Sequence, residues 1–177
     1  MSGRLERRGD GWQLRFERRF DAPIEAVWNA LIEPEDLAAW FPQRIVGEWC
    51  VGAPLRFEFT DQDVPPFEGI VRVFEPPSSL EYSWGTDVLR FELVADGLRC
   101  VLTLLDQFDE GGKAVRDAAG WHACLDFLEA HLTETKPPWT SSERWRELHR
   151  EYLDSMPAEA ATIGPPAMLD PDAASAG

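Results

Sequence analysis

Residues 20–41 have the sequence FDAPIEAVWNALIEPEDLAAWF, which predicts two helices that are separated by a proline. Pro23 suits the first turn of a helix, where the missing N–H costs nothing. The apolar residues that follow have the spacing of one buried helical face: Ile24, Val27, Trp28 and Leu31. Pro34 ends this helix and begins a shorter one, which Pro42 stops. The second helix carries three apolar residues: Leu37, Trp40 and Phe41.

Strands are predicted both before and after these helices in the sequence. Segment 12–20 alternates apolar and polar residues and predicts a strand with one buried face, although Arg18 breaks the pattern and is expected near an edge or a bend. The same alternation returns in five segments that short turns separate: 55–59, 67–73, 80–84, 89–93 and 98–105. Successive strands with short connections predict an antiparallel meander, whose apolar face must be covered.

The segment 114–132 is predicted to be a long helix that covers the apolar face of the sheet. Its apolar residues recur at helical spacing: Trp121, Cys124, Leu125, Leu128 and Leu132. A long helix on a curved antiparallel sheet is an α+β arrangement of two layers. We therefore expect one domain over 1–133 and a C-terminal extension over 134–177. The extension begins with a capping box at Thr140–Glu143 and a helix at about 141–154, and an Ala/Pro-rich tail without regular structure follows.

Composition narrows the function classes. The chain has 177 residues, 44% of them hydrophobic, and a net charge of −15, which disfavours binding to nucleic acid or to an anionic membrane surface. No apolar stretch is long enough to span a membrane, and the N-terminal residues lack the apolar region of a signal peptide. Three separated cysteines predict free thiols in a reducing compartment. We expect a cytoplasmic protein.

The order of strand, two helices, strands and long helix is that of the helix-grip fold. The opening motif 20–41 resembles START-like (SRPBCC) proteins, and within them the homologues of the C-terminal domain of the activator of the heat-shock-protein-90 ATPase. Two later motifs, FEGIVRVFEPP at 67–77 and LEYSW at 80–84, are similar to the same family, as is Gly120-Trp121 in the long helix. The resemblance covers about 11–133.

This resemblance implies a curved antiparallel sheet wrapped around the long C-terminal helix. It also implies a central cavity, where relatives hold apolar or amphipathic small molecules, and it implies no reaction. The co-chaperone that gives the family its name carries a further N-terminal domain, for which this chain is too short. A chaperone partner is therefore not expected.

Seven residues are the predicted ligand-binding residues: Trp40, Phe41, Phe57, Phe59, Trp84, Trp121 and Leu125. Taken singly, each aromatic member is more simply explained as part of the core. Taken together, eight tryptophans in so small a chain favour a large apolar site with indole N–H groups as polar handles.

Catalytic chemistry has little support in the sequence. His122 and Asp126 are four residues apart and could touch on one helical face, although a solvent-side or capping role explains this histidine more simply. The histidines and cysteines have no metal-ligand spacing, and no cofactor motif occurs. Arginine and glutamate residues alternate on the polar side of the strands, which is typical of a solvated face with cross-strand ion pairs: Arg56, Arg72, Arg90, Arg99, Glu58, Glu68, Glu81 and Glu92.

Three functions are compatible with these observations. The first, which we adopt, is binding of a hydrophobic or amphipathic small molecule in the central cavity, with no metal, cofactor, nucleic acid or membrane as partner; a homodimer is compatible with it. The second is an enzyme of the cyclase, aromatase or hydrolase kind, in which His122 is the first candidate for proton transfer. The third is a protein-interaction module such as a chaperone regulator.

Overall fold

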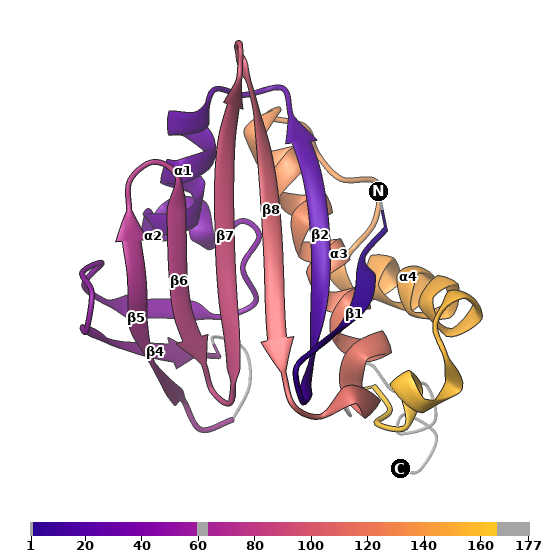
Figure 1. Cartoon of the computed structure of the whole chain (residues 1–177). Helices are drawn as coiled ribbons and strands as arrows, with labels where there is room; N and C mark the ends of the chain where they lie inside the picture. The colour runs from indigo at the N-terminus through magenta and orange to yellow at the C-terminus, as the bar shows by residue number, and fades with distance from the viewer. Residues whose placement is uncertain (1, 60–63, 166–177) are drawn as a thin grey trace.

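The computed structural model describes residues 2–59 and 64–165, and in them eight strands form one antiparallel sheet (Figure 1). Across the sheet the strand order is β1-β2-β8-β7-β6-β5-β4-β3. The strands are β1 (Arg4–Arg8), β2 (Gly11–Phe20), β3 (Arg44–Gly47), β4 (Pro54–Glu58), β5 (Phe67–Glu75), β6 (Ser79–Trp84), β7 (Asp87–Asp96) and β8 (Arg99–Phe108). β2 therefore closes the meander by pairing with β8, the last strand along the chain.

The helices lie on one face of this sheet (Figure 1). They are α1 (Ile24–Ile32), α2 (Pro34–Leu37), α3 (Ala114–Leu132) and α4 (Ser141–Ser155), with the short 3₁₀ turns η1 (Gly111–Lys113) and η2 (Ala158–Ala161). The long helix α3 crosses the sheet beside β2 and β8, and α1 packs against α3, β7 and β8. This arrangement confirms the predicted α+β helix-grip fold. Among the helices of the described residues, none has the length and apolar composition to cross a membrane.

The core lies between the sheet and α3. Alternating residues of the strands turn inward and meet the apolar stripe of the helix, where Leu125 and Leu128 are fully buried. The fully buried strand residues include Leu14, Phe16, Phe91, Leu102 and Leu104. Each such side chain stabilises the fold by about 1.5–3 kcal/mol relative to an exposed position.

The two edge strands were not predicted, and their sequences show why. β1 has the sequence RLERR, in which only Leu5 is partly buried, and β3 has only four residues. An edge strand is held by hydrogen bonds to one neighbour and needs no apolar face, so no alternation marks it. The predicted strand at 98–105 also starts one residue later, because Leu98 lies in a turn and is 88% exposed.

Arg18 breaks the alternation of β2 because it lies on the inward side and bonds across the layers. Its guanidinium is 3.1 Å from Oδ1 of Asp126 on α3, and both side chains are nearly buried. At this position β2 pairs only with β8, since β1 ends its pairing at Arg15. The expectation of a nearby edge is thus confirmed, and the ion pair supplies the reason for a charge on an apolar face.

The C-terminal extension packs against α3. The capping box at Thr140 and Glu143 starts α4, and the apolar side of α4 is buried through Trp145, Leu148 and Tyr152. The tail was expected to lack regular structure, which is wrong for residues 158–161. Residues 158–161 form η2, where Ala160 is buried, and the N–H of Ile163 donates to the carbonyl of Gly112 over 3.0 Å. Residues 166–177 of the predicted tail lie outside the described residues.

Candidate functional site

A pocket of about 560 Å³ lies between α3 and the end of the sheet where β6 turns into β7. Five aromatic side chains line it: Phe59, Phe67, Trp84, Trp121 and Trp145. The rings of Trp84 and Trp121 meet edge to face with centroids 5.3 Å apart, and Phe67 meets Trp84 in the same way at 5.6 Å. Phe67, Trp84 and Trp121 therefore form one continuous surface, which we call the aromatic wall.

The β6–β7 turn brings a carboxylate to the end of this wall. Trp84 pairs with Asp87, so the turn between them contains only Gly85 and Thr86. Gly85 has a φ of 61°, a conformation that a glycine adopts without strain and that two-residue hairpin turns require. The tight turn therefore places an aromatic ring and a carboxylate side by side, at the border of the pocket.

Charged residues at the start of α3 face Asp87 across this end of the pocket. We call Asp87, Lys113, Arg116 and Asp117 together the polar end of the pocket. The Lys113 ammonium contacts the Asp87 carboxylate and lies 3.2 Å from Oδ2 of Asp117, whose Oδ1 is 2.8 Å from Nε of Arg116. Burial lowers the pKa of Lys113, but the carboxylates of Asp117 and Asp87 outweigh it and leave the pKa raised. Burial also raises the pKa of Asp87, although Lys113 opposes this shift. The polar end is thus made of paired charges.

Asp106 on β8 lies behind the pocket and is completely buried. Its Oδ2 accepts a hydrogen bond of 2.9 Å from Nε1 of Trp121, whereas its Oδ1 has no hydrogen-bond partner among the described residues. Burial raises the pKa of Asp106 well above the ordinary value, and the charges of Asp87 and Asp117 raise it further. Burial disfavours the charged form of this carboxyl group.

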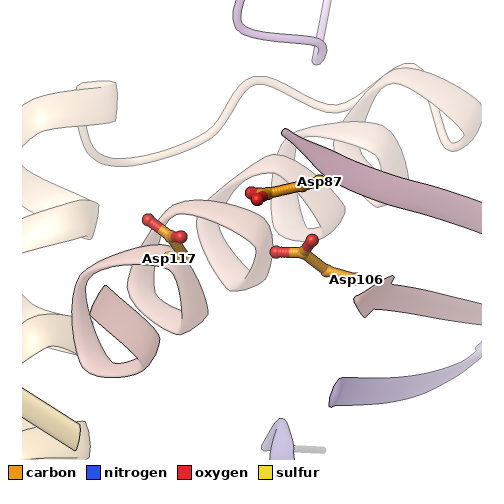
Figure 2. A group of neighbouring side chains, drawn as sticks. All are labelled: Asp87, Asp106 and Asp117. Carbon is orange, nitrogen blue, oxygen red and sulfur yellow. The ribbon is translucent and has the colours of Figure 1, made fainter. Parts of the chain in front are cut away.

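Asp87, Asp106 and Asp117 form a group that we call the aspartate cluster. One carboxylate oxygen from each lies within 4.8 Å of the others. Figure 2 shows the three carboxyl groups gathered between α3 and the strand ends that carry Asp87 and Asp106. Oxygen ligands of this kind suit hard cations.

The structure divides the seven residues predicted to bind a ligand into two groups. Phe59, Trp84 and Trp121 line the pocket. The other four are buried in the core: Trp40, Phe41, Phe57 and Leu125. The Phe41 ring supports the pocket wall from behind, with its centroid 5.7 Å from that of Trp121.

Sequence reasoning did not select the rest of the lining. Phe67 stands in a predicted strand and Trp145 in the apolar stripe of a predicted helix, so both looked like ordinary core positions. Asp87 at the start of β7, Lys113 at the end of η1 and Asp117 on α3 are ordinary charged residues in the sequence. A signal that could have marked Asp87 is its place directly after the Gly85-Thr86 turn, next to an inward-facing tryptophan.

His122 is buried, so the expectation of a solvent-side or capping histidine is wrong. Its Nδ1 lies 2.9 Å from the hydroxyl of Tyr152 on α4, and its Nε2 lies 3.7 Å from Oδ1 of Asp126. Burial lowers the pKa of His122 to about 4, and the positive charges of Arg18 and Arg144 add to this effect. The residues that line the pocket do not include His122. Its contact with Tyr152 instead connects α3, which carries His122, to α4.

Some of the ion pairs that we expected on the polar face of the strands are present. Arg90 lies 3.1 Å from its cross-strand partner Glu81 and 2.8 Å from Glu92. Arg99, by contrast, pairs with Asp21 at 2.6 Å. None of these residues lines the pocket.

Comparisons with known proteins agree with this architecture. Residues 21–133 match the family model of the Activator of Hsp90 ATPase homolog 1-like protein. No functionally curated protein matches the sequence.

Three solved structures show the fold in other proteins. A conserved protein of unknown function from Enterococcus faecalis is 20% identical, with a TM-score of 0.71 over 86% of this chain and 89% of that one. CalU16 from Micromonospora echinospora is 21% identical, with a TM-score of 0.67 over 86% and 96%. A protein from Bordetella parapertussis is 24% identical, with a TM-score of 0.66 over 88% and 91%.

Proposed function

The chain belongs to the Activator of Hsp90 ATPase homolog 1-like family, and from this premise we propose that it binds a hydrophobic or amphipathic small molecule in the pocket between α3 and the β6–β7 turn. The helix-grip fold suits this role because a curved sheet and a helix can enclose a ligand between two layers. A volume of about 560 Å³ lies within the usual range for small-molecule sites, about 300–1,000 Å³.

The aromatic wall is the observation that carries the proposal. Trp84 donates through Nε1 to Oε1 of Gln43 over 3.1 Å, and Trp121 donates to Asp106 over 2.9 Å. Both indoles are therefore held in place before a ligand arrives. A rigid apolar wall binds without losing side-chain entropy, so more of the gain from apolar burial remains as affinity.

The polar end indicates the kind of head group. Its cations, Lys113 and Arg116, already pair with Asp87 and Asp117. An anionic head group would meet these carboxylates and the net charge of −15. We therefore favour an uncharged polar group, such as a hydroxyl or an amide, on an apolar body.

Gly120 provides the sharpest test, because it lies on the pocket wall within α3. Among the described residues, a Cβ at this position would have only the Trp145 indole nitrogen near it, at 3.9 Å, so a larger side chain can enter the pocket without disturbing the helix. The experiment titrates N-phenyl-1-naphthylamine, an uncharged apolar fluorophore, into the full chain. We expect saturable binding that Gly120→Leu weakens at least tenfold.

The control variant is Arg150→Leu, which adds the same side chain to an exposed position of α4. We expect it to bind the probe like the wild type. Gly120→Leu should melt at the same or a higher temperature than the wild type, since leucine favours a helix over glycine by about 0.8 kcal/mol. Equal probe affinity in Gly120→Leu and the wild type would exclude this pocket as the binding site.

A further inference from the structure

We propose that the aspartate cluster binds a hard divalent cation of the larger kind, Ca²⁺ or Mn²⁺, which takes the place of the Lys113 ammonium between the carboxylates. The three ligands would come from Asp87 at the start of β7, Asp106 on β8 and Asp117 in the first turns of α3. This inference is independent of the proposed ligand-binding function.

The donor set and its spacing select the class of ion. Three carboxylates with no nitrogen or sulfur ligand favour Ca²⁺, Mn²⁺ or Mg²⁺ over zinc or copper. The candidate oxygens lie within 4.8 Å of one another. Mg²⁺ demands near-ideal octahedral geometry and usually binds through one or two carboxylates, whereas Ca²⁺ accepts a flexible geometry and more oxygen ligands. Three carboxylates therefore suit the larger ion better.

A buried oxygen of the cluster points to a ligand. Oδ1 of Asp106 is buried and has no hydrogen-bond partner among the described residues, although its carboxyl group lies beside those of Asp87 and Asp117 (Figure 2). Oδ2 of Asp117 is buried too and is ion-paired with the Lys113 ammonium at 3.2 Å. An ion at the centre would coordinate Oδ1 of Asp106 and take over the ion pair of Asp117.

Trp121 orients the carboxyl group of Asp106, which would be one ligand of such an ion. Its indole N–H donates to Oδ2 of Asp106, which fixes the plane of the carboxyl group and leaves Oδ1 for the ion. Hydrogen-bond donors that lie behind the ligands commonly hold them in position at metal sites.

Lys113 shows that the cluster already accommodates a positive charge. Its ammonium bonds to Asp87 and Asp117, and its side chain also borders the pocket. The four-carbon stem lets the ammonium turn into the pocket when an ion enters. A divalent ion then neutralises more of the three carboxylates than one ammonium does. Because it must displace the lysine, the site is weaker than one built without that residue.

Terbium luminescence is a direct test in the full chain. Tb³⁺ substitutes for Ca²⁺ and emits when a nearby indole transfers energy to it, and Trp121 lies within hydrogen-bond distance of Asp106. We expect a saturable signal that Ca²⁺ displaces. Asp106→Asn should weaken Tb³⁺ binding at least tenfold, and Lys113→Gln should strengthen it at least tenfold.

Two controls separate the cluster from the general acidity of the chain. Glu68→Gln removes one exposed carboxylate and Arg150→Gln one exposed base, so each repeats the change in net charge elsewhere. Both should bind Tb³⁺ as the wild type does. The proposal is overturned if the wild type shows no Ca²⁺-displaceable signal, if Asp106→Asn binds normally, or if Lys113→Gln binds no more tightly than Arg150→Gln. Should Asp106→Asn fail to fold, the Lys113→Gln comparison decides.

Discussion

The indole Nε1 of Trp121 donates a hydrogen bond of 2.9 Å to Oδ2 of Asp106, and this bond links the aromatic wall of the pocket to the buried acid behind it. Trp121 is 3% exposed and Asp106 is fully buried, so water cannot replace either partner. One contact therefore fixes both the position of a pocket ring and the orientation of a carboxyl group.

Trp121→Phe should destabilise the protein by about 1–3 kcal/mol, because it leaves a buried carboxyl group without its donor. The measurement is the free energy of unfolding in urea at pH 7. Trp84→Phe is the matched control, since it removes the same atoms from a half-buried indole that bonds to Gln43. An equal loss of stability in both variants would contradict the role assigned to the Trp121–Asp106 bond.

His122 should make the stability depend on pH between about 6.5 and 4. The folded protein holds its pKa at about 4, below the ordinary value of 6.5, so the unfolded chain binds the proton first as the pH falls. The stabilising contribution is complete above pH 6.5 and is lost progressively toward pH 4, by at most about 3 kcal/mol. Urea unfolding at pH 7.5, 5.5 and 4.5 measures this loss.

His122→Asn is the reference for that measurement. Its side-chain amide offers both a donor and an acceptor to the Tyr152 hydroxyl, but the side chain does not titrate. The carboxylates titrate in both proteins and cancel in the difference. If the wild type and His122→Asn lose equal stability between pH 7.5 and 4.5, the pH dependence does not come from this histidine.

The Tyr152 hydroxyl should hold three segments of the chain together. It accepts a hydrogen bond of 2.7 Å from the N–H of Gly3 and lies 2.9 Å from Nδ1 of His122, so it joins the N-terminal segment, α3 and α4. Tyr152→Phe should cost about 1–3 kcal/mol and speed amide exchange in α4 more than in the sheet. Exchange measured by mass spectrometry reports the two regions separately.

A double-mutant cycle isolates the contact between Tyr152 and His122. We expect Tyr152→Phe and His122→Asn to be coupled by about 1 kcal/mol, since they share one buried hydrogen bond. Additive effects on the unfolding free energy would show that the contact between Tyr152 and His122 does not stabilise the docking of α4.

Gly69→Ala should destabilise the sheet where β5 and β6 approach each other. A Cβ at Gly69 would overlap the backbone carbonyl oxygen of Ser83, which cannot move without opening the strand pair. We expect a loss of about 1–3 kcal/mol in urea unfolding, as for other overpacked sites. No described residue lies within 4 Å of a Cβ at Gly164, so Gly164→Ala should be neutral, and a neutral Gly69→Ala would contradict the close approach.

Much of the fold could be predicted because its signals are local. The alternation in β2, the helical stripe of α3 over 114–132 and the capping box at Thr140 each arise from neighbouring residues that share one environment. The edge strands β1 and β3 escaped prediction because hydrogen bonds to a single neighbour hold them, and such bonds leave no pattern of side chains.

The site depended on tertiary structure. Phe57 and Phe59 lie two residues apart and share one face by periodicity, yet Phe57 is fully buried in the core and Phe59 borders the pocket. Periodicity gives the direction of a side chain but not its depth, which the curvature of the sheet sets.

The sequence by itself determined the layers of this protein, since the long helices and the inner strands each carry an apolar face. Only the tertiary structure decided which residues form the pocket and the aspartate cluster. Asp87 and Asp106 lie in strands β7 and β8, Asp117 lies in helix α3, and Trp145 comes from the C-terminal extension. Their meeting depends on the distance between the sheet and α3, which the packing of the whole core fixes.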